Sequence, residues 1–131
     1  MLTTMLLPAA LLLQAVPEAA TPAGPATPPP TRIEDLTVEE SAALRCSVAF
    51  AFISDWQKDS DPRGQAWPGL AENGGREFFV RTMAQLMDRR GLDRRGVLDL
   101  VALQTEQLNA SPGDIPAIMP ACLMMKSAAG L

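Results

Sequence analysis

The 131-residue chain contains no histidine and no tyrosine, and its only aromatic residues are two tryptophans and four phenylalanines. Without histidine, the chain lacks the usual general base, the commonest metal ligand and the base of Ser-His and Cys-His catalytic arrangements. Carboxylate pairs can also perform acid–base catalysis, but no constellation of aspartates and glutamates in the sequence supports such a pair. The sequence therefore predicts a protein that is not an enzyme and that carries no cofactor or metal.

Cysteine is scarce, and so are basic tracts. Cys46 and Cys122 are the only cysteines, too far apart for a CxxC redox motif and too few for a four-ligand zinc site. Residues 72–75 are no phosphate loop, since they follow no predicted strand and lack a lysine. The formal net charge is −4, with both signs mixed along the folded part. Nucleic acid is therefore excluded as an expected partner.

The chain begins with an apolar run at residues 5–16. Its length suits the hydrophobic region of a signal peptide and falls short of the roughly 20 residues that span a bilayer. We predict that residues 1–20 are a signal peptide and that the mature chain starts between Val16 and Gly24, in the periplasm or outside the cell. The alternative is an uncleaved N-terminal helix or membrane anchor.

A spacer rich in proline follows at residues 21–31, where proline removes backbone donors and prevents helix or strand from propagating. The remaining residues 32–131 are enough for one hydrophobic core and too few for two domains. The sequence therefore predicts a single domain behind a leader and a spacer, without stable membrane insertion after cleavage.

The first predicted helix has a well-marked start, because Thr37 and Glu40 have the spacing of a capping box. Apolar residues then follow at intervals of three and four, which indicates one buried helical stripe. The members of this stripe are Val38, Ala42, Cys46, Ala49, Phe50, Ile53 and Trp56. We expect this helix to be the central one and to end at residues 59–62.

Residues 59–75 contain several glycines and prolines and are expected to be a long irregular loop. Loops of this length in compact domains are uncommon and often functional. The apolar members Trp67 and Leu70 are our candidate binding residues. Trp67 either pins the loop to the domain, which we favour, or exposes its ring to a partner.

Three more helical segments follow. The second, over residues 75–90, places Phe79, Val80, Met83, Leu86 and Met87 on one face. Gly91 is suited to end it in the left-handed region, and Asp93 to cap the third helix, which makes a helical hairpin. In the last segment, two prolines predict a short turn followed by a helix that begins near Pro120.

Together these segments predict an all-α fold, a small bundle of four to five helices. Cys46 and Cys122 both lie on core-facing positions of separate helices, so we predict one disulfide between them. The alternative is two reduced, buried cysteines in a protein that is never exported. The methionines at positions 83, 87, 119, 124 and 125 are interpreted as core packing rather than as a copper(I) site.

The stretch at residues 115–122 and the helical Cys46, in a short all-helical chain, resemble the acid-stress chaperones of the bacterial periplasm. These are small helical proteins with one disulfide that joins their early and late helices. The resemblance implies client binding through apolar surface that low pH exposes. Residues 76–82 are in turn similar to small exported bacterial proteins that have no assigned activity.

The sequence thus predicts a non-enzymatic, exported helical protein with a binding or envelope-support role and a protein as its partner. One alternative is a periplasmic chaperone of the acid-stress type. Another is an inhibitor or immunity-type partner of a second exported protein, with Trp67 and the loop at residues 59–75 as its contact surface. The oligomeric state is left open by the sequence.

Overall fold

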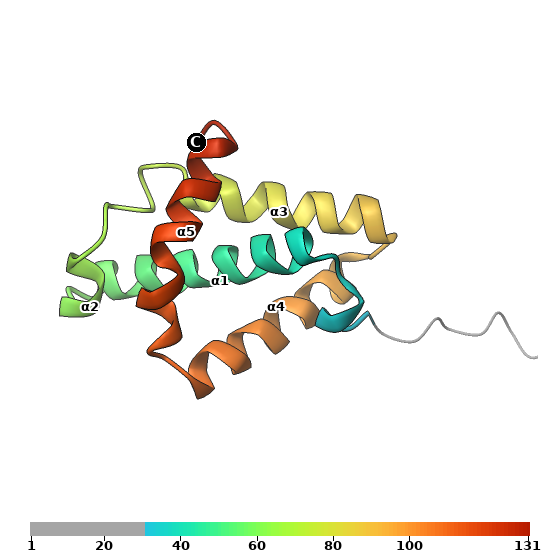
Figure 1. Cartoon of the computed structure of the whole chain (residues 1–131), viewed down its shortest axis with the longest axis horizontal. Helices are drawn as coiled ribbons and strands as arrows, with labels where there is room; N and C mark the ends of the chain where they lie inside the picture. The colour runs from blue at the N-terminus through green and yellow to red at the C-terminus, as the bar shows by residue number, and fades with distance from the viewer. Residues whose placement is uncertain (1–30) are drawn as a thin grey trace, which may run out of the picture.

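The computed structural model describes residues 31–131, and this part of the chain is helical without any strand (Figure 1). This confirms the predicted all-α class. The predicted leader, the cleavage site and nearly all of the spacer lie in residues 1–30, outside the described residues. The elements are a short 3-10 helix η1 (Ile33–Asp35) and the helices α1 (Val38–Lys58), α2 (Pro62–Gln65), α3 (Gly75–Arg90), α4 (Arg94–Ala110) and α5 (Asp114–Ala128).

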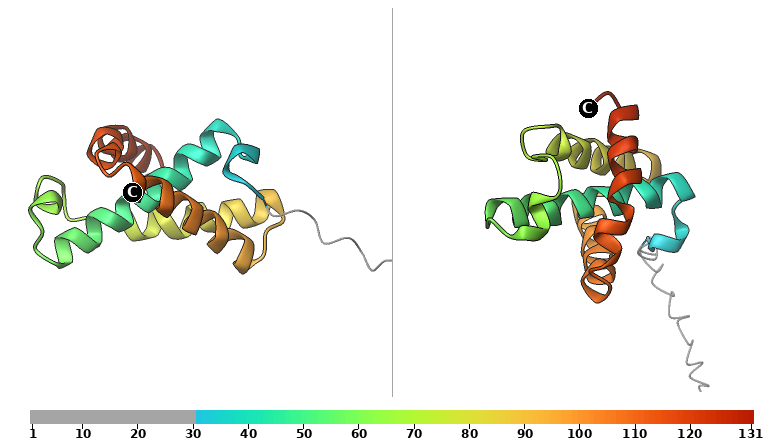
Figure 2. Two further views of the ribbon diagram at one scale, coloured as in Figure 1. Left: turned by 90° about the horizontal axis from the view of Figure 1, so that it is seen from below. Right: turned by 60° about the vertical axis from the view of Figure 1, so that its left-hand side comes forward.

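Helix α1 is the central element, and each of the four other α-helices packs against it (Figure 2). Its start is the predicted capping box: the Thr37 hydroxyl accepts a hydrogen bond from the Glu40 amide at 3.1 Å, and the Glu40 carboxylate accepts one from the Thr37 amide at 3.0 Å. The fully buried side chains of α1 include Leu44, Phe50 and Ile53. The helix is therefore both the longest element and the centre of the core.

Helices α3 and α4 form the predicted hairpin. Gly91 ends α3 with φ at 62°, in the left-handed region that favours glycine. Asp93 then caps α4, and its carboxylate accepts a hydrogen bond from the Gly96 amide at 2.8 Å. Three residues thus suffice to turn the chain and begin the next helix.

Two valines that we placed on buried stripes are exposed. Val38 is 87% exposed because it is the first residue of α1 and lies beyond the main core. Val80 is 58% exposed because α3 buries Phe78, Thr82 and Leu86, and Val80 lies about 200° around the helix from Phe78. The apolar residues of α3 therefore occupy two faces, and only one of them is covered.

The prediction for the last segment was wrong. Helix α5 begins at Asp114 and continues through Pro120, whereas we expected a separate turn and a helix that begins near Pro120. Pro120 removes only one backbone hydrogen bond, and its side chain is exposed. The burial of Ile115, Met119 and Cys122 along one side of the helix offsets that loss.

The predicted disulfide is present. Cys46 of α1 and Cys122 of α5 are bonded, with their Cα atoms 5.2 Å apart, and both residues are at least 95% buried. The bond joins residues 76 positions apart in the sequence. It therefore fastens the last helix of the domain to the central one.

Candidate functional site

A groove of about 970 Å³ lies between the second half of α1, the segment of residues 64–72 and the first half of α3. We call it the Trp67 groove. Its apolar lining comes from Phe50, Ala51, Trp67, Ala71, Phe79 and Val80. Charged residues of both signs also line it, namely Asp55, Lys58, Glu72 and Arg76. An apolar floor with a mixed charged rim suits an amphipathic occupant.

Gln57 of α1 holds the segment that forms one wall of the groove. Its side-chain nitrogen lies 3.0, 3.1 and 2.8 Å from the carbonyl oxygens of Gly64, Trp67 and Pro68, to which it donates. Its side-chain oxygen accepts a hydrogen bond from the Leu70 amide at 3.1 Å. One glutamine therefore fixes the path of seven consecutive residues that have few other backbone partners.

The structure separates the two candidate binding residues. Leu70 is fully buried in the core and offers no surface to a partner. Trp67 is partly buried: it packs against the core and also lines the groove. Packing against the core agrees with the interpretation that Trp67 pins the loop to the domain, and contact of its ring with a partner stays a prediction.

The predicted irregular stretch contains the short helix α2, which the sequence analysis missed. Asp61 caps it by accepting a hydrogen bond from the Arg63 amide at 2.9 Å. The Arg63 guanidinium pairs with the same carboxylate at 2.6 Å and, with the amide, lowers the pKa of Asp61 to about 2. Arg63 also stacks 4.2 Å above the ring of Trp56. Asp61 therefore serves as the cap of α2.

The end of the chain holds the other side of the loop. The Lys126 side chain is buried and donates to the Asn73 carbonyl oxygen at 2.7 Å. Leu131 packs so closely on Gly74 that a Cβ there would lie 3.0 Å from the Leu131 Cβ. The Arg81 guanidinium donates to the Ala129 carbonyl oxygen at 3.1 Å. The segment of residues 64–75 is thus fixed at one end by Gln57 and at the other by the end of α5.

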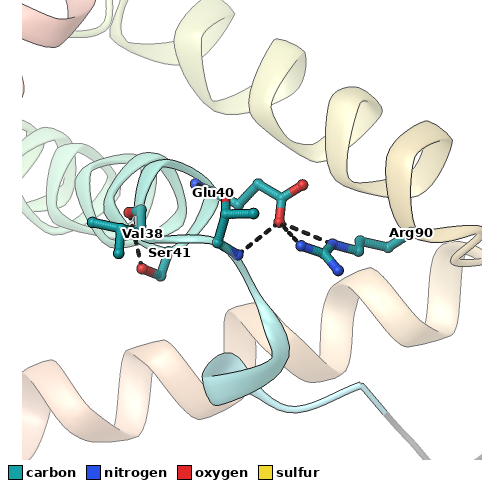
Figure 3. A network of polar contacts seen from close by, with 5 residues as sticks. Val38, Glu40, Ser41 and Arg90 are labelled. Atoms are coloured by element: carbon teal, nitrogen blue, oxygen red, sulfur yellow. Dashed lines mark hydrogen bonds and ion pairs between the residues drawn. The ribbon is translucent and has the colours of Figure 1, made fainter.

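A second polar network lies at the opposite end of α1 (Figure 3). Arg90 donates from two nitrogens to a single oxygen of Glu40, and the distance from its Nε is 2.9 Å. The same oxygen accepts the Thr37 amide. The Glu40 side chain is only 8% exposed. Arg90, followed by the Thr37 amide, holds the pKa of the Glu40 carboxyl below its ordinary value.

The sequence analysis missed Gln57 and Arg90 as organising residues. Gln57 follows the apolar stripe of its helix by one position, and Arg90 lies at the end of the second predicted helix, where no neighbouring residue indicates a partner for it. In residues 31–131 no three His, Cys, Asp or Glu side chains are grouped in a way that would hold a metal ion. The lining of the groove itself offers apolar surface and charges of both signs.

No family model, curated protein or solved structure matches the chain. Within the described range, no helix has both the length and the apolar character needed to cross a membrane. What the protein does must therefore be argued from its own geometry.

Proposed function

We propose that this chain is a non-enzymatic, exported binding protein that takes a segment of a protein partner into the Trp67 groove. The observation that carries the proposal is the groove itself, with Trp67 in its wall and the exposed Val80 beside it. Large apolar side chains left open in a concave site are typical of binding surfaces. The Cys46–Cys122 bond supports export, because disulfides persist in oxidising compartments.

The kind of segment follows from the fold. The described residues offer no sheet edge to which a partner could add a strand. A helix in a groove is the remaining common mode for an apolar floor between helices, with anchors that recur every three or four residues. The acidic and basic rim residues, including Glu72 and Arg76, suit a helix that carries both signs of charge beside its apolar stripe.

Pre-organisation also favours binding at this place. The hydrogen bonds of Gln57 and Lys126 hold both ends of the loop before any partner arrives. A loop that is already ordered loses less conformational entropy when it binds. The same rigidity would serve an inhibitor or immunity-type role, in which a one-to-one complex forms at neutral pH.

The test is selection of helical peptides from a displayed library on the oxidised protein, followed by affinity measurement with three variants. Val80→Glu places a charge in the groove, whereas Leu98→Glu changes an equally exposed residue of α4 that does not line it. We expect Val80→Glu and Trp67→Ala to weaken binding at least tenfold and Leu98→Glu to leave it unchanged. Equal affinity for all variants, with helical content preserved, would exclude the groove.

A second candidate function is protection of client proteins in acid. The observation that favours it is the lowered pKa of Glu40 and of Asp61, which makes the fold less stable as pH falls. Such a chaperone should bind a hydrophobic dye more strongly near pH 3 than at pH 7 and slow client aggregation there. Flat dye binding over this range, with groove binding intact at neutral pH, would eliminate this candidate.

A further inference from the structure

Beyond its first residue, the outer face of α5 carries no charge. One of its two charged residues, Asp114, lies at the first position and pairs with Arg45 at 3.2 Å. The other, Lys126, is buried. The exposed positions of the helix after Asp114 are Pro116, Ala117, Pro120, Ala121, Met124, Ser127 and Ala128. A helix that is apolar on its outer face as well as its inner one is normally covered on both.

The other long helices differ in this respect. The exposed face of α3 includes Arg76 and Arg81, and that of α4 includes Arg95 and Asp99. In Figures 1 and 2, α5 crosses α1 at the outside of the domain. The uncharged surface is therefore a property of this one helix, and its position leaves it accessible to another molecule.

This surface has both a projection and a hollow. Met124 is 74% exposed and projects from the outer face. A hollow of about 380 Å³ lies along the flank of the same helix, beside the disulfide. Its apolar lining includes Ile118, Ala121, Met125, Ala42 and Val38, and its polar lining consists of Ser41, Arg45, Gln104 and Gln107. A flexible methionine is well suited to fill an irregular apolar hollow. Met124 lies within one helical turn of Ala121 and Met125, which line the hollow.

We propose that the α5 face binds a second copy of this chain. A twofold axis near Ala121 would place the two α5 helices antiparallel, with Met124 of each copy opposite Ile118 of the other. Each Met124 would then enter the partner's hollow, and the small Ala117 and Ala121 would let the helices approach closely. In this register position 114 lies opposite position 128, so the Asp114–Arg45 pairs stay at the two outer ends, in solvent.

Charge argues for a second copy over the other faces of the same chain. Against α3 or α4, the uncharged face would bury arginine or aspartate side chains without partners, which is costly. Against another α5, the facing helices bring no charge beyond Asp114, and Arg45, which lines the hollow, keeps its pair with Asp114. Because a 15-residue helix is only about 22 Å long, the contact is small, and the dimer should form reversibly with concentration.

Sedimentation of the oxidised protein over a range from low micromolar to near-millimolar concentration tests the proposal. We expect the mass to double with concentration in wild type and in Leu98→Glu, and to stay monomeric in Ala121→Glu and in Ala121→Lys. Because residue 121 faces itself across the axis, an equimolar mixture of the two Ala121 variants should dimerise again.

Three results would overturn the proposal. A wild-type protein that stays monomeric throughout excludes self-association, and a dimer that persists in Ala121→Glu and Met124→Glu excludes α5. Variants that dissociate but do not recombine in the mixture exclude the antiparallel arrangement. Peptide binding to the Trp67 groove should be unchanged in Ala121→Glu. If the chain does not self-associate, the proposed function is therefore unaffected and is decided by the peptide-binding test.

Discussion

Arg90, the last residue of α3, and Thr37, the residue before α1, both donate hydrogen bonds to the same carboxylate oxygen of Glu40. One oxygen therefore caps the central helix and ties it to the end of another helix 50 residues later. The carboxylate is nearly buried, whereas the Arg90 side chain keeps 29% of its surface exposed. This geometry makes Glu40 one of the charged residues on which the pH dependence of the fold should depend.

The first prediction concerns acid. Since the pKa of Glu40 is lower in the folded state than its ordinary value of 4.5, the carboxylate stabilises the fold fully above pH 4.5. That stabilisation is lost as pH falls below 4.5 and through the folded value. Glu40→Gln keeps a cap oxygen but removes the charge, so it should lower the free energy of unfolding at pH 7 and make little difference near pH 2. Urea unfolding measured at a series of pH values gives this difference directly.

A matched control for the acid prediction is Glu77→Gln. Glu77 also pairs with an arginine, Arg81, at 2.8 Å, but both side chains are about half exposed. Exposed pairs of this kind add little to stability. If Glu77→Gln changes the pH dependence of the free energy of unfolding as much as Glu40→Gln does, the Glu40–Arg90 pair has no special role in it.

The second prediction concerns the disulfide. Replacing Cys46 and Cys122 together by alanine should lower the free energy of unfolding by about 4 to 5 kcal/mol, because the bond restricts the unfolded chain over a loop of 76 residues. Urea unfolding of the double variant measures this loss, and wild type with reductant should lose a similar amount. If reductant leaves the midpoint where it was while the thiols become open to alkylation, the bond does not stabilise the domain.

Local signals in the sequence predicted much of the fold. The capping box at Thr37, the Gly91 and Asp93 turn and the pairing of the two cysteines each depend on a few neighbouring residues or on one shared face. These features were confirmed. The prolines of the last segment misled us, since packing on α1 outweighs the one hydrogen bond that Pro120 removes.

The candidate site was harder to predict, because its contacts join residues that lie far apart in the sequence and share no periodic pattern. Trp67 was found from its place in a loop, but the role of Gln57 depends on how the loop folds back over α1. The partner of Arg90 lies 50 positions away. No periodic pattern marks such pairs, since a polar side chain beside an apolar stripe looks the same whether it faces water or a backbone carbonyl.

The third prediction concerns Gln57. Its replacement by leucine removes the donor to three carbonyl oxygens and the acceptor for the Leu70 amide, so it should cost about 2 kcal/mol of stability. The Leu70 amide should also exchange with solvent much faster. Gln57→Glu retains an acceptor for the Leu70 amide but turns a carboxylate oxygen toward the three carbonyl oxygens, so repulsion should loosen the loop and speed the exchange of that amide as well. Hydrogen exchange at Leu70 is the measurement, and equal protection in all three proteins would contradict the role of Gln57.

The last prediction compares two glycines. At Gly91 a Cβ would meet no atom within 4 Å. Gly91→Ala should therefore lower stability only through the left-handed φ of 62°, which costs a residue with a Cβ roughly 1 to 2 kcal/mol. At Gly75, in the first turn of α3, a Cβ would lie 2.8 Å from the Leu70 carbonyl oxygen, so the loop itself must shift. Gly75→Ala should therefore weaken a peptide bound in the Trp67 groove, whereas Gly91→Ala should lower stability and leave that affinity as it is. Urea unfolding and peptide titration on both variants separate the two effects. If Gly91→Ala weakens the peptide as much as Gly75→Ala, the affinity follows overall stability, and the close contact between Gly75 and Leu70 does not shape the groove.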